Sequence, residues 1–156
     1  MVDTTVGMRR KLAFELTTAV MATAATFLRE SQRLFRPHGL TAAQYNVLNV
    51  LVGCPDGMSQ RELGDLLVVD RSNVTGLLDR MEKAGWVRRA DDPADRRVYR
   101  VTVTTSGRAL WARIEPRYRE VVEQVTRRFT AKQMGEGLAL LHGLGEAATR
   151  WTLPES

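Results

Sequence analysis

Residues 59–104 read SQRELGDLLVVDRSNVTGLLDRMEKAGWVRRADDPADRRVYRVTVT, and this stretch decides the fold. Ser59 and Glu62 match a capping box, in which the serine side chain accepts from a backbone N–H and the acid bonds back. A short helix is therefore predicted to begin here. Asp70 can cap a second helix that runs to Ala84. The stretch thus predicts two short helices joined by a tight turn.

The periodicity changes after Gly85, a residue type that often ends helices. Residues 87–90 and 98–104 alternate apolar and polar side chains, as short β-strands do. Between them, the sequence DDPAD contains the residue types that build turns. A helix pair followed directly by a hairpin with two arginines near its tip is a rarer combination than either part alone.

Helices are also predicted on both sides of this stretch, where apolar residues recur with helical spacing. They cover residues 5–35, 42–52, 105–129 and 131–151. Capping boxes at Thr41 and Thr130 support two of these starts. Pro116 lies inside the third helix and is expected to kink or interrupt it, because proline lacks a backbone donor.

The whole chain has a globular balance of residues, with 26% charged and 44% hydrophobic. Its net charge of +5 favours a polyanionic partner without naming one. Between Ser59 and Arg108, however, ten basic residues stand against eight acidic ones. A nucleic-acid interpretation must therefore depend on where the charges lie.

Several classes of function are disfavoured by what the sequence lacks. Cys54 is the single cysteine, which rules out an intrachain disulfide and a cysteine-rich metal site. His38 and His142 are far apart, and we find no phosphate-binding glycine loop or nucleophile motif, so we expect no enzyme activity and no cofactor. We also expect no membrane-spanning segment and no signal peptide, and hence a cytoplasmic location.

The second helix of the pair has the side chains needed to contact base edges in a major groove. In a helix-turn-helix the N-terminal residues of that helix contact the bases, while the first helix crosses the backbone. The predicted base-reading residues are Arg71, Ser72, Asn73, Thr75 and Gly76. Asparagine can pair with adenine and arginine with guanine, and the glycine allows a close approach. Gln60 and Arg61 are suited to phosphates.

The hairpin supplies a second contact. Arg96 and Arg97 lie at its tip beside Asp95, and a narrow minor groove attracts inserted arginine. The aspartate is expected to hold an arginine or the loop backbone in place. The arginines that flank the tip and could meet phosphates are Arg88, Arg89 and Arg100.

The terminal helices carry more apolar surface than a chain of this size easily hides. Packing both termini against a second copy would cover it and give a two-fold dimer. Such a dimer could bind a palindromic operator with half-sites about one helical turn apart. The alternative is a single-chain helical bundle that uses the same faces.

The sequence resembles the MarR family of winged-helix transcription regulators over nearly its whole length. The matching segments are LTAAQY at 40–45, EL at 62–63, VT at 74–75, LDRME at 78–82, GWVRR at 85–89, DPADRR at 92–97 and TTSG at 104–107. The resemblance implies a mainly α fold with a small β hairpin. It divides the chain into a dimerisation helix (1–40), a winged helix-turn-helix (41–104, wing 87–103) and C-terminal dimerisation helices (105–156).

The resemblance also implies a function. It implies a homodimeric repressor that binds double-stranded DNA and leaves the DNA when a small, commonly aromatic or phenolic ligand binds. It assigns the wing arginine to Arg97 and its positioning partner to Asp95. The residues predicted to line the ligand crevice are Phe27, His38, Tyr45, Asn49 and Trp111. Two alternatives stay open, namely a winged helix that grips only another protein and a cysteine-based redox-responsive regulator. The family's redox branch uses a cysteine near the N-terminus, which Cys54 does not match.

Overall fold

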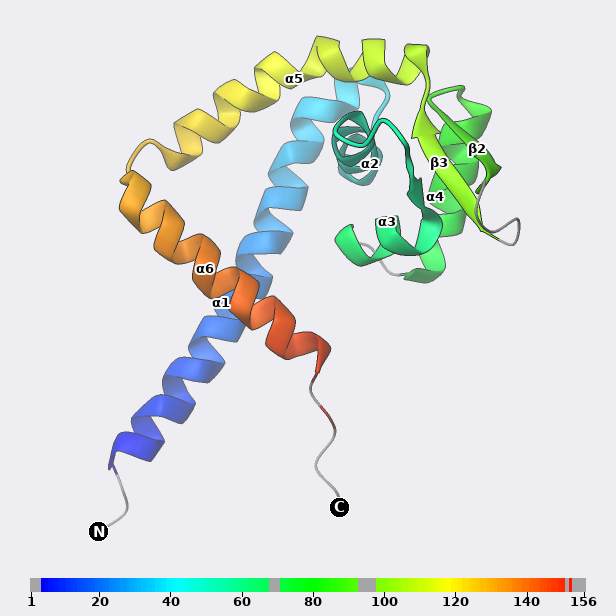
Figure 1. Cartoon of the computed structure of the whole chain (residues 1–156). Coiled ribbons are helices and arrows are strands. Elements are labelled where there is room, and N and C mark those ends of the chain that lie inside the picture. The colour runs from blue at the N-terminus through cyan, green and yellow to red at the C-terminus, as the bar shows by residue number, and fades with distance from the viewer. Residues whose placement is uncertain (1–3, 68–70, 93–97, 151, 153–156) are drawn as a thin grey trace. The chain divides into compact units, whose positions relative to one another are not determined.

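The computed structural model describes residues 4–67, 71–92, 98–150 and 152. These residues form a mostly helical chain with a small sheet, as the sequence predicts (Figure 1). Its elements are α1 (Thr4–Phe35), the 3-10 helix η1 (Arg36–His38), α2 (Ala42–Val52), β1 (Met58–Ser59), α3 (Gln60–Leu66), α4 (Arg71–Lys83), β2 (Val87–Asp91), β3 (Tyr99–Val103), α5 (Thr105–Thr126) and α6 (Ala131–Thr149).

The chain divides into two compact units, residues 1–116 and residues 117–156. The first contains α1 to β3 and the first half of α5, and therefore all the residues predicted to bind DNA or a ligand. The second contains the rest of α5 and α6. The division into 1–40, 41–104 and 105–156 concerns the roles of the segments and stays a prediction.

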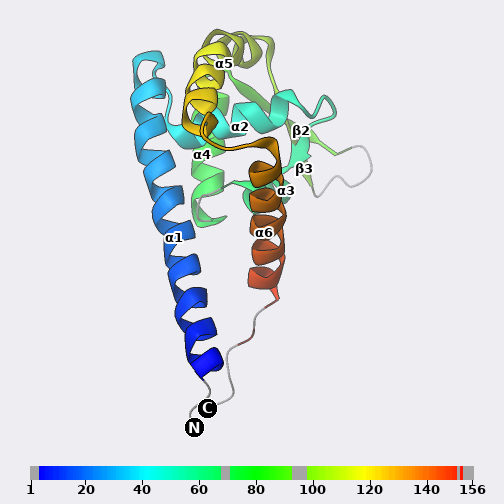
Figure 2. The same ribbon diagram turned by 90° about the vertical axis from the view of Figure 1, so that its left-hand side faces the viewer.

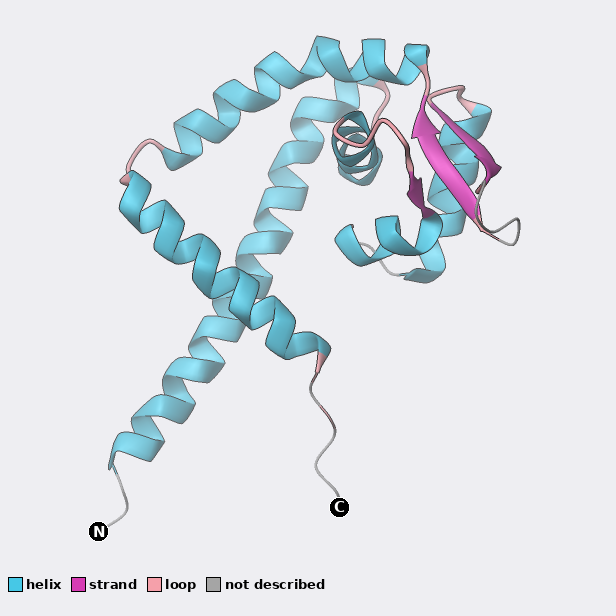
Figure 3. Ribbon diagram, viewed as in Figure 1, coloured by secondary structure: helices cyan, strands magenta, loops and turns pink. Residues whose placement is uncertain are grey.

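The sheet is antiparallel, with strand order β1-β3-β2 (Figure 3). The predicted hairpin is confirmed as β2 and β3, which pair in register from Val87↔Val103 to Asp91↔Tyr99. Strand β1 was not predicted, because two residues are too few for a periodic signal. It reaches β3 through Gly57, whose φ of +73° and close approach to the Val101 carbonyl leave no room for a side chain.

The core of the first unit lies where α2 and α4 meet the sheet. From α2 it takes Tyr45, Val47, Leu48 and Leu51, and from α4 it takes Val74, Leu77, Leu78 and Met81. The rings of Tyr45 and Phe35 stack with their centroids 4.3 Å apart, which joins the end of α1 to this core. The buried positions of α4 recur every three or four residues, so one face of that helix is fixed to the core.

The predicted helix boundaries are largely confirmed by local geometry. Complete capping boxes begin α2 at Thr41, α3 at Ser59 and α6 at Thr130. Gly85 follows α4 with a φ of +73°, the left-handed conformation that glycine adopts at low cost. The predicted cap at Asp70 lies outside the described residues.

Pro116 does not interrupt its helix, so that part of the prediction is wrong. Helix α5 continues through it from Thr105 to Thr126. A proline removes one backbone hydrogen bond, and the bonds of neighbouring turns can keep the helix continuous. The division between the two compact units nevertheless falls directly after this residue.

Helix α1 is long, and its N-terminal half extends away from the other elements of the first unit (Figure 2). Exposed apolar side chains along it include Leu12, Phe14 and Met21. By length and composition alone, residues 5–38 could cross a membrane, and none of that apolar window is buried. The expectation of no membrane-spanning segment is not contradicted by this criterion and stays a prediction. The criterion is weak for one helix, since a helix that packs against a partner also meets it.

Candidate nucleic-acid interface

Helices α3 and α4 form the predicted helix pair, and a direct hydrogen bond joins them. Ser59 Oγ accepts from the Glu62 amide, and Glu62 Oε2 accepts from the Ser59 amide at 2.7 Å, which completes the capping box. Directly after this cap, Gln60 Nε2 donates to Thr75 Oγ1 on α4 at 2.5 Å. The start of α3 is therefore held against the first turns of α4.

The face of α4 that points away from the core carries the predicted reading residues. Asn73 and Thr75 are exposed, and Gly76 is half-buried. Arg71 and Ser72 belong to the first turn of the helix, but the structure does not describe their side chains. A side chain at Gly76 would meet only the end of Arg80 at ordinary contact distance, so the surface of the helix is open there.

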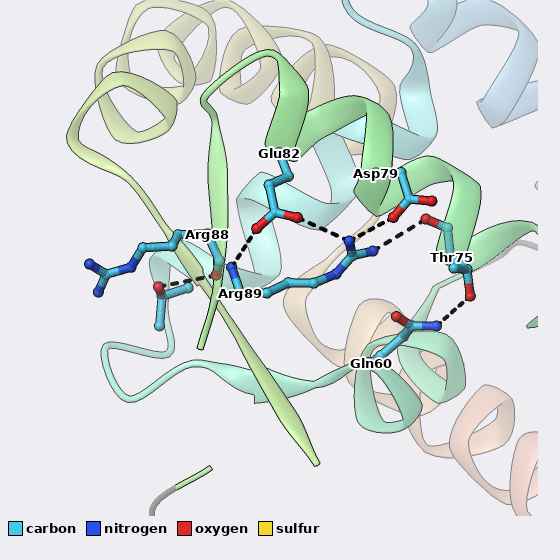
Figure 4. A network of polar contacts seen from close by, with 7 residues as sticks. Gln60, Thr75, Asp79, Glu82, Arg88 and Arg89 are labelled. Carbon is cyan, nitrogen blue, oxygen red and sulfur yellow. Dashed lines mark hydrogen bonds and ion pairs between the residues drawn. The ribbon is translucent and has the colours of Figure 1, made fainter. Parts of the chain in front are cut away.

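Arg89 on β2 is bound to α4 rather than held out toward solvent (Figure 4). Its Nη1 donates to Asp79 Oδ1 at 2.6 Å and to Glu82 Oε2 at 3.0 Å. Nη2 reaches the Thr75 carbonyl at 3.4 Å, and the Arg89 amide donates to Glu82 Oε1 at 2.9 Å. We call Arg89, Asp79, Glu82 and the Thr75 carbonyl the Arg89 cluster.

Arg88 is the neighbour of Arg89, and its side chain lies on the other face of the strand. It is exposed and extends away from the Arg89 cluster in Figure 4. This follows from the alternation of side chains along a strand. Arg61, at the start of α3, is also exposed. These two arginines have the access that a phosphate contact requires.

Arg100 fixes the base of the wing. Its Nε donates to Asp92 Oδ2 at 2.7 Å, and its Nη1 donates to the carbonyls of Gly57 at 2.8 Å and Asp56 at 3.2 Å. The hydrogen bond and charge of Asp92 raise the pKa of Arg100. The turn before β1 and the two ends of the hairpin are thereby joined, and the predicted tip residues Asp95, Arg96 and Arg97 lie outside the described residues.

Glu62 is the acid of the α3 capping box, and its environment favours the charged form. The backbone hydrogen bond from Ser59 lowers the pKa of this carboxyl, and the Ser59 side chain and the charge of Arg100 lower it further. The helix start is therefore linked electrostatically to the base of the wing.

The residues predicted to line a ligand crevice have different environments. Tyr45 is completely buried against Phe35, whereas Phe27 is 55% exposed. His38 is half-buried at the end of η1. Asn49 and Trp111 do meet, because the Trp111 Nε1 donates to the Asn49 Oδ1 at 3.1 Å. This pair therefore connects α5 to α2.

The alternative of a cysteine-based redox regulator gains no support from the surroundings of Cys54. Cys54 is a half-buried free thiol in the turn between α2 and β1. Among the described residues, no three His, Cys, Asp or Glu side chains form a cluster that could hold a metal ion. The Arg89 cluster, in contrast, was missed by sequence reasoning. A possible signal was present: two acids three residues apart, at 79 and 82, followed closely by Arg89.

Comparison with known proteins gives a consistent family. A model of the MarR family matches residues 38–98. The transcriptional regulator TtmR of Methylorubrum extorquens is 39% identical over 68% of this chain and 54% of its own length. The transcriptional activatory protein BadR of Rhodopseudomonas palustris is 36% identical over 70% of this chain and 63% of its own. This chain therefore spans about half to two thirds of the length of these two relatives. The regulator PecS of Dickeya dadantii is 30% identical over 72% of this chain and 69% of its own.

Solved structures share the fold. A mutant MarR from E. coli, complexed with operator DNA, has a TM-score of 0.70 and 27% identity, over 83% of this chain and 93% of that one. CouR from Rhodococcus jostii RHA1, bound to p-coumaroyl-CoA, has a TM-score of 0.76 over 92% of this chain and 98% of that one. Its identity is 23%, so that likeness concerns the fold alone.

Proposed function

The chain belongs to the MarR family, and from this we propose that it is a homodimeric transcription regulator that binds palindromic double-stranded DNA. The observation that carries the proposal is the exposed face of α4. Val74 and Leu78 fix one side of the helix to the core, which leaves Asn73, Thr75 and Gly76 on the side open to a major groove. A protein-binding winged helix would not need this set of polar side chains.

The structure changes which arginines we assign to phosphates. Arg61 and Arg88 are exposed and keep that role in the proposal. Arg89 and Arg100 were predicted as phosphate contacts too, but both have strong partners within the chain. We therefore assign Arg89 and Arg100 to the support of α4 and the wing. Arg97 keeps the predicted role of entering the minor groove, and Asp95 keeps its predicted role as the positioning partner of Arg97.

The apolar surface of the terminal helices supports the proposed dimer. Each of them has several large apolar side chains that are at least 40% exposed in the single chain. A second copy would cover these faces and present two reading helices to two half-sites. This gain from two linked contacts is why a dimer binds an operator more tightly than one copy does. The proposal places the protein in the cytoplasm, where its DNA is.

A small aromatic or phenolic ligand is proposed as the effector that releases DNA. The support is the Trp111–Asn49 pair, which joins an indole on α5 to an amide on α2. A planar ligand can stack on the indole and take over the amide's hydrogen bond. Whether DNA binding represses or activates a gene depends on where the operator lies relative to the promoter. We expect repression where the two overlap.

The experiment is selection of bound duplexes from random DNA by the full chain, followed by mapping of the recovered sequence. We expect a palindrome with half-sites about one helical turn apart. Asn73→Ala should then lose discrimination at particular base pairs by about tenfold, which corresponds to about 1.4 kcal/mol for one direct base contact. If wild type enriches no sequence, the protein is not a sequence-specific DNA binder and the proposal fails.

A further inference from the structure

We propose that Arg89 is a positioning residue that sets the orientation of the reading helix α4 relative to the wing and does not contact DNA. This inference rests on the proposed function, because it concerns how the same interface discriminates between sequences. Four observations carry it: the geometry of α4, the edge of the sheet, the burial of the guanidinium and the connection to α3.

The acceptors on α4 lie along a single face of that helix. Thr75, Asp79 and Glu82 are separated by four and then three residues, the spacing that stacks side chains on one side of a helix. Arg89 contacts all three positions, as Figure 4 shows. One guanidinium therefore spans about two turns of the reading helix, and this fixes both its distance from β2 and its rotation.

The contact also uses the open edge of the sheet. Strand β2 is an outer strand, since β3 lies between it and β1. The Arg89 amide donates to Glu82, so this backbone group bonds to α4. Glu82 thus binds both the backbone and the side chain of Arg89. Such a two-point, charge-assisted contact is more directional than a single ion pair.

Burial and charge argue against a phosphate contact. The Arg89 side chain is 19% exposed, whereas its partner Asp79 is 58% exposed. A phosphate that approached the Arg89 guanidinium would meet the carboxylates of Asp79 and Glu82 first. Like charges repel, so the cluster disfavours an anion at this position. The acids on the DNA-facing side of the protein are explained if Arg89 needs them as partners.

The connection extends to α3 through Thr75. Arg89 reaches the Thr75 carbonyl, and Gln60 donates to the Thr75 hydroxyl. Strand β2, helix α4 and helix α3 are therefore joined at one residue, which lies two positions from Asn73. Base readout requires placement within about 0.5 Å, so loss of this support should reduce discrimination between sequences before it reduces general attraction to DNA.

The main test compares Arg89→Gln with Arg88→Gln, which removes the same charge from the neighbouring residue on the opposite face of the strand. Affinities for the selected operator and for a scrambled duplex are measured over a range of salt concentrations. A lost phosphate contact lowers the slope of log affinity against log salt by about 0.9. We expect this for Arg88→Gln, with both duplexes weakened alike. For Arg89→Gln we expect an unchanged slope and about tenfold less discrimination.

Two further variants separate positioning from general electrostatics. Lysine can serve as a phosphate contact but cannot span two carboxylates and a carbonyl, so Arg89→Lys should not restore discrimination. Asp79→Asn removes a negative charge, which by charge alone should tighten binding to every duplex. We expect the Asp79→Asn operator-to-scrambled ratio to fall about fivefold instead. Circular dichroism and thermal unfolding verify that each variant is folded. If Arg89→Gln does not fold, Asp79→Asn still tests the inference.

The outcomes are distinguishable. Suppose that wild type selects an operator, but Arg89→Gln lowers the salt slope and weakens binding to both duplexes equally. Arg89 is then a phosphate contact, and this inference is overturned while the proposed function stands. Full rescue by Arg89→Lys, or an unchanged ratio in Asp79→Asn, would overturn it as well. If wild type selects no operator, the proposed function fails, and this inference fails with it.

Discussion

At the scale of single residues, backbone contacts between elements are the most sensitive points of this fold. A Cβ atom at Gly107, on the first turn of α5, would overlap the Trp86 carbonyl oxygen directly before β2 and meet Val103 Cγ2 at 3.0 Å. Thr104 caps the same turn, because its Oγ1 accepts from the Gly107 amide and donates to the Gly85 carbonyl. The start of α5 is thus held against the turn between α4 and β2.

Gly107→Ala should therefore destabilise the protein, by at least about 2 kcal/mol, since a backbone atom cannot move aside as a side chain can. Chemical denaturation measures the free energy of unfolding. Gly76→Ala is the matched control in α4, where the added methyl meets only the end of Arg80. It should raise stability by about 0.5–1 kcal/mol, because alanine favours a helix. Equal stability of the two variants would contradict the packing at Gly107.

At the scale of elements, the helix starts are set by local chemistry and the helix contacts by long-range chemistry. The capping box of α3 needs only Ser59 and Glu62, and the sequence predicts it correctly. The contact of α4 with β2 needs Arg89 to fold back onto acids on another element. Periodicity indicates which face of α4 is apolar, but it does not indicate which polar side chain on β2 meets the other face.

The capping box also predicts how α3 responds to acid. The pKa of Glu62 is lowered from its ordinary value of 4.5, so the charged form is favoured in the folded state. Its contribution to stability is present above about pH 4.5 and is lost as the pH falls through the lower folded value. Glu62→Gln keeps a hydrogen-bond acceptor but cannot titrate. Between pH 7 and pH 3, the midpoint temperature of thermal unfolding should fall less steeply for Glu62→Gln than for wild type. Parallel curves would mean that Glu62 contributes nothing to the acid response.

At the scale of the whole molecule, a single chain exposes many large apolar side chains, and a partner would explain them. Met134, Leu138 and Leu141 on α6 are separated by four and three residues, so they form one stripe on the helix. All three are at least 40% exposed. Large exposed apolar stripes on helices are typical of interaction surfaces.

Leu138→Glu should therefore convert the proposed dimer into monomers, because the variant would bury an unpaired carboxylate in the proposed interface. Sedimentation velocity at micromolar concentration measures the change, and operator affinity should fall with it. Gln133→Glu is the control, since it adds the same charge to α6 outside the stripe and preserves the capping box. A Leu138→Glu protein that stays dimeric would show that this stripe is not the interface.

The sequence by itself determined the parts of this protein that depend on neighbouring residues. Capping boxes, the stop at Gly85, the alternation in β2 and β3 and the apolar face of α4 all arise from contacts within a few positions of the chain. The fold class and the exposed polar face of α4 could be predicted for that reason. Local rules also predicted a kink or an interruption at Pro116, and the interruption is absent because the bonds of the neighbouring turns keep the helix continuous.

Only the tertiary structure decided which side chains are partners. It added β1, whose two residues form a strand only because β3 lies beside them. It also separated Arg88 from Arg89, which are identical by residue type and adjacent in sequence. Opposite faces of one strand give them different surroundings, solvent for the first and two carboxylates for the second. Charge can be counted from a sequence, but whether a charge is free to meet another molecule depends on what the fold places against it.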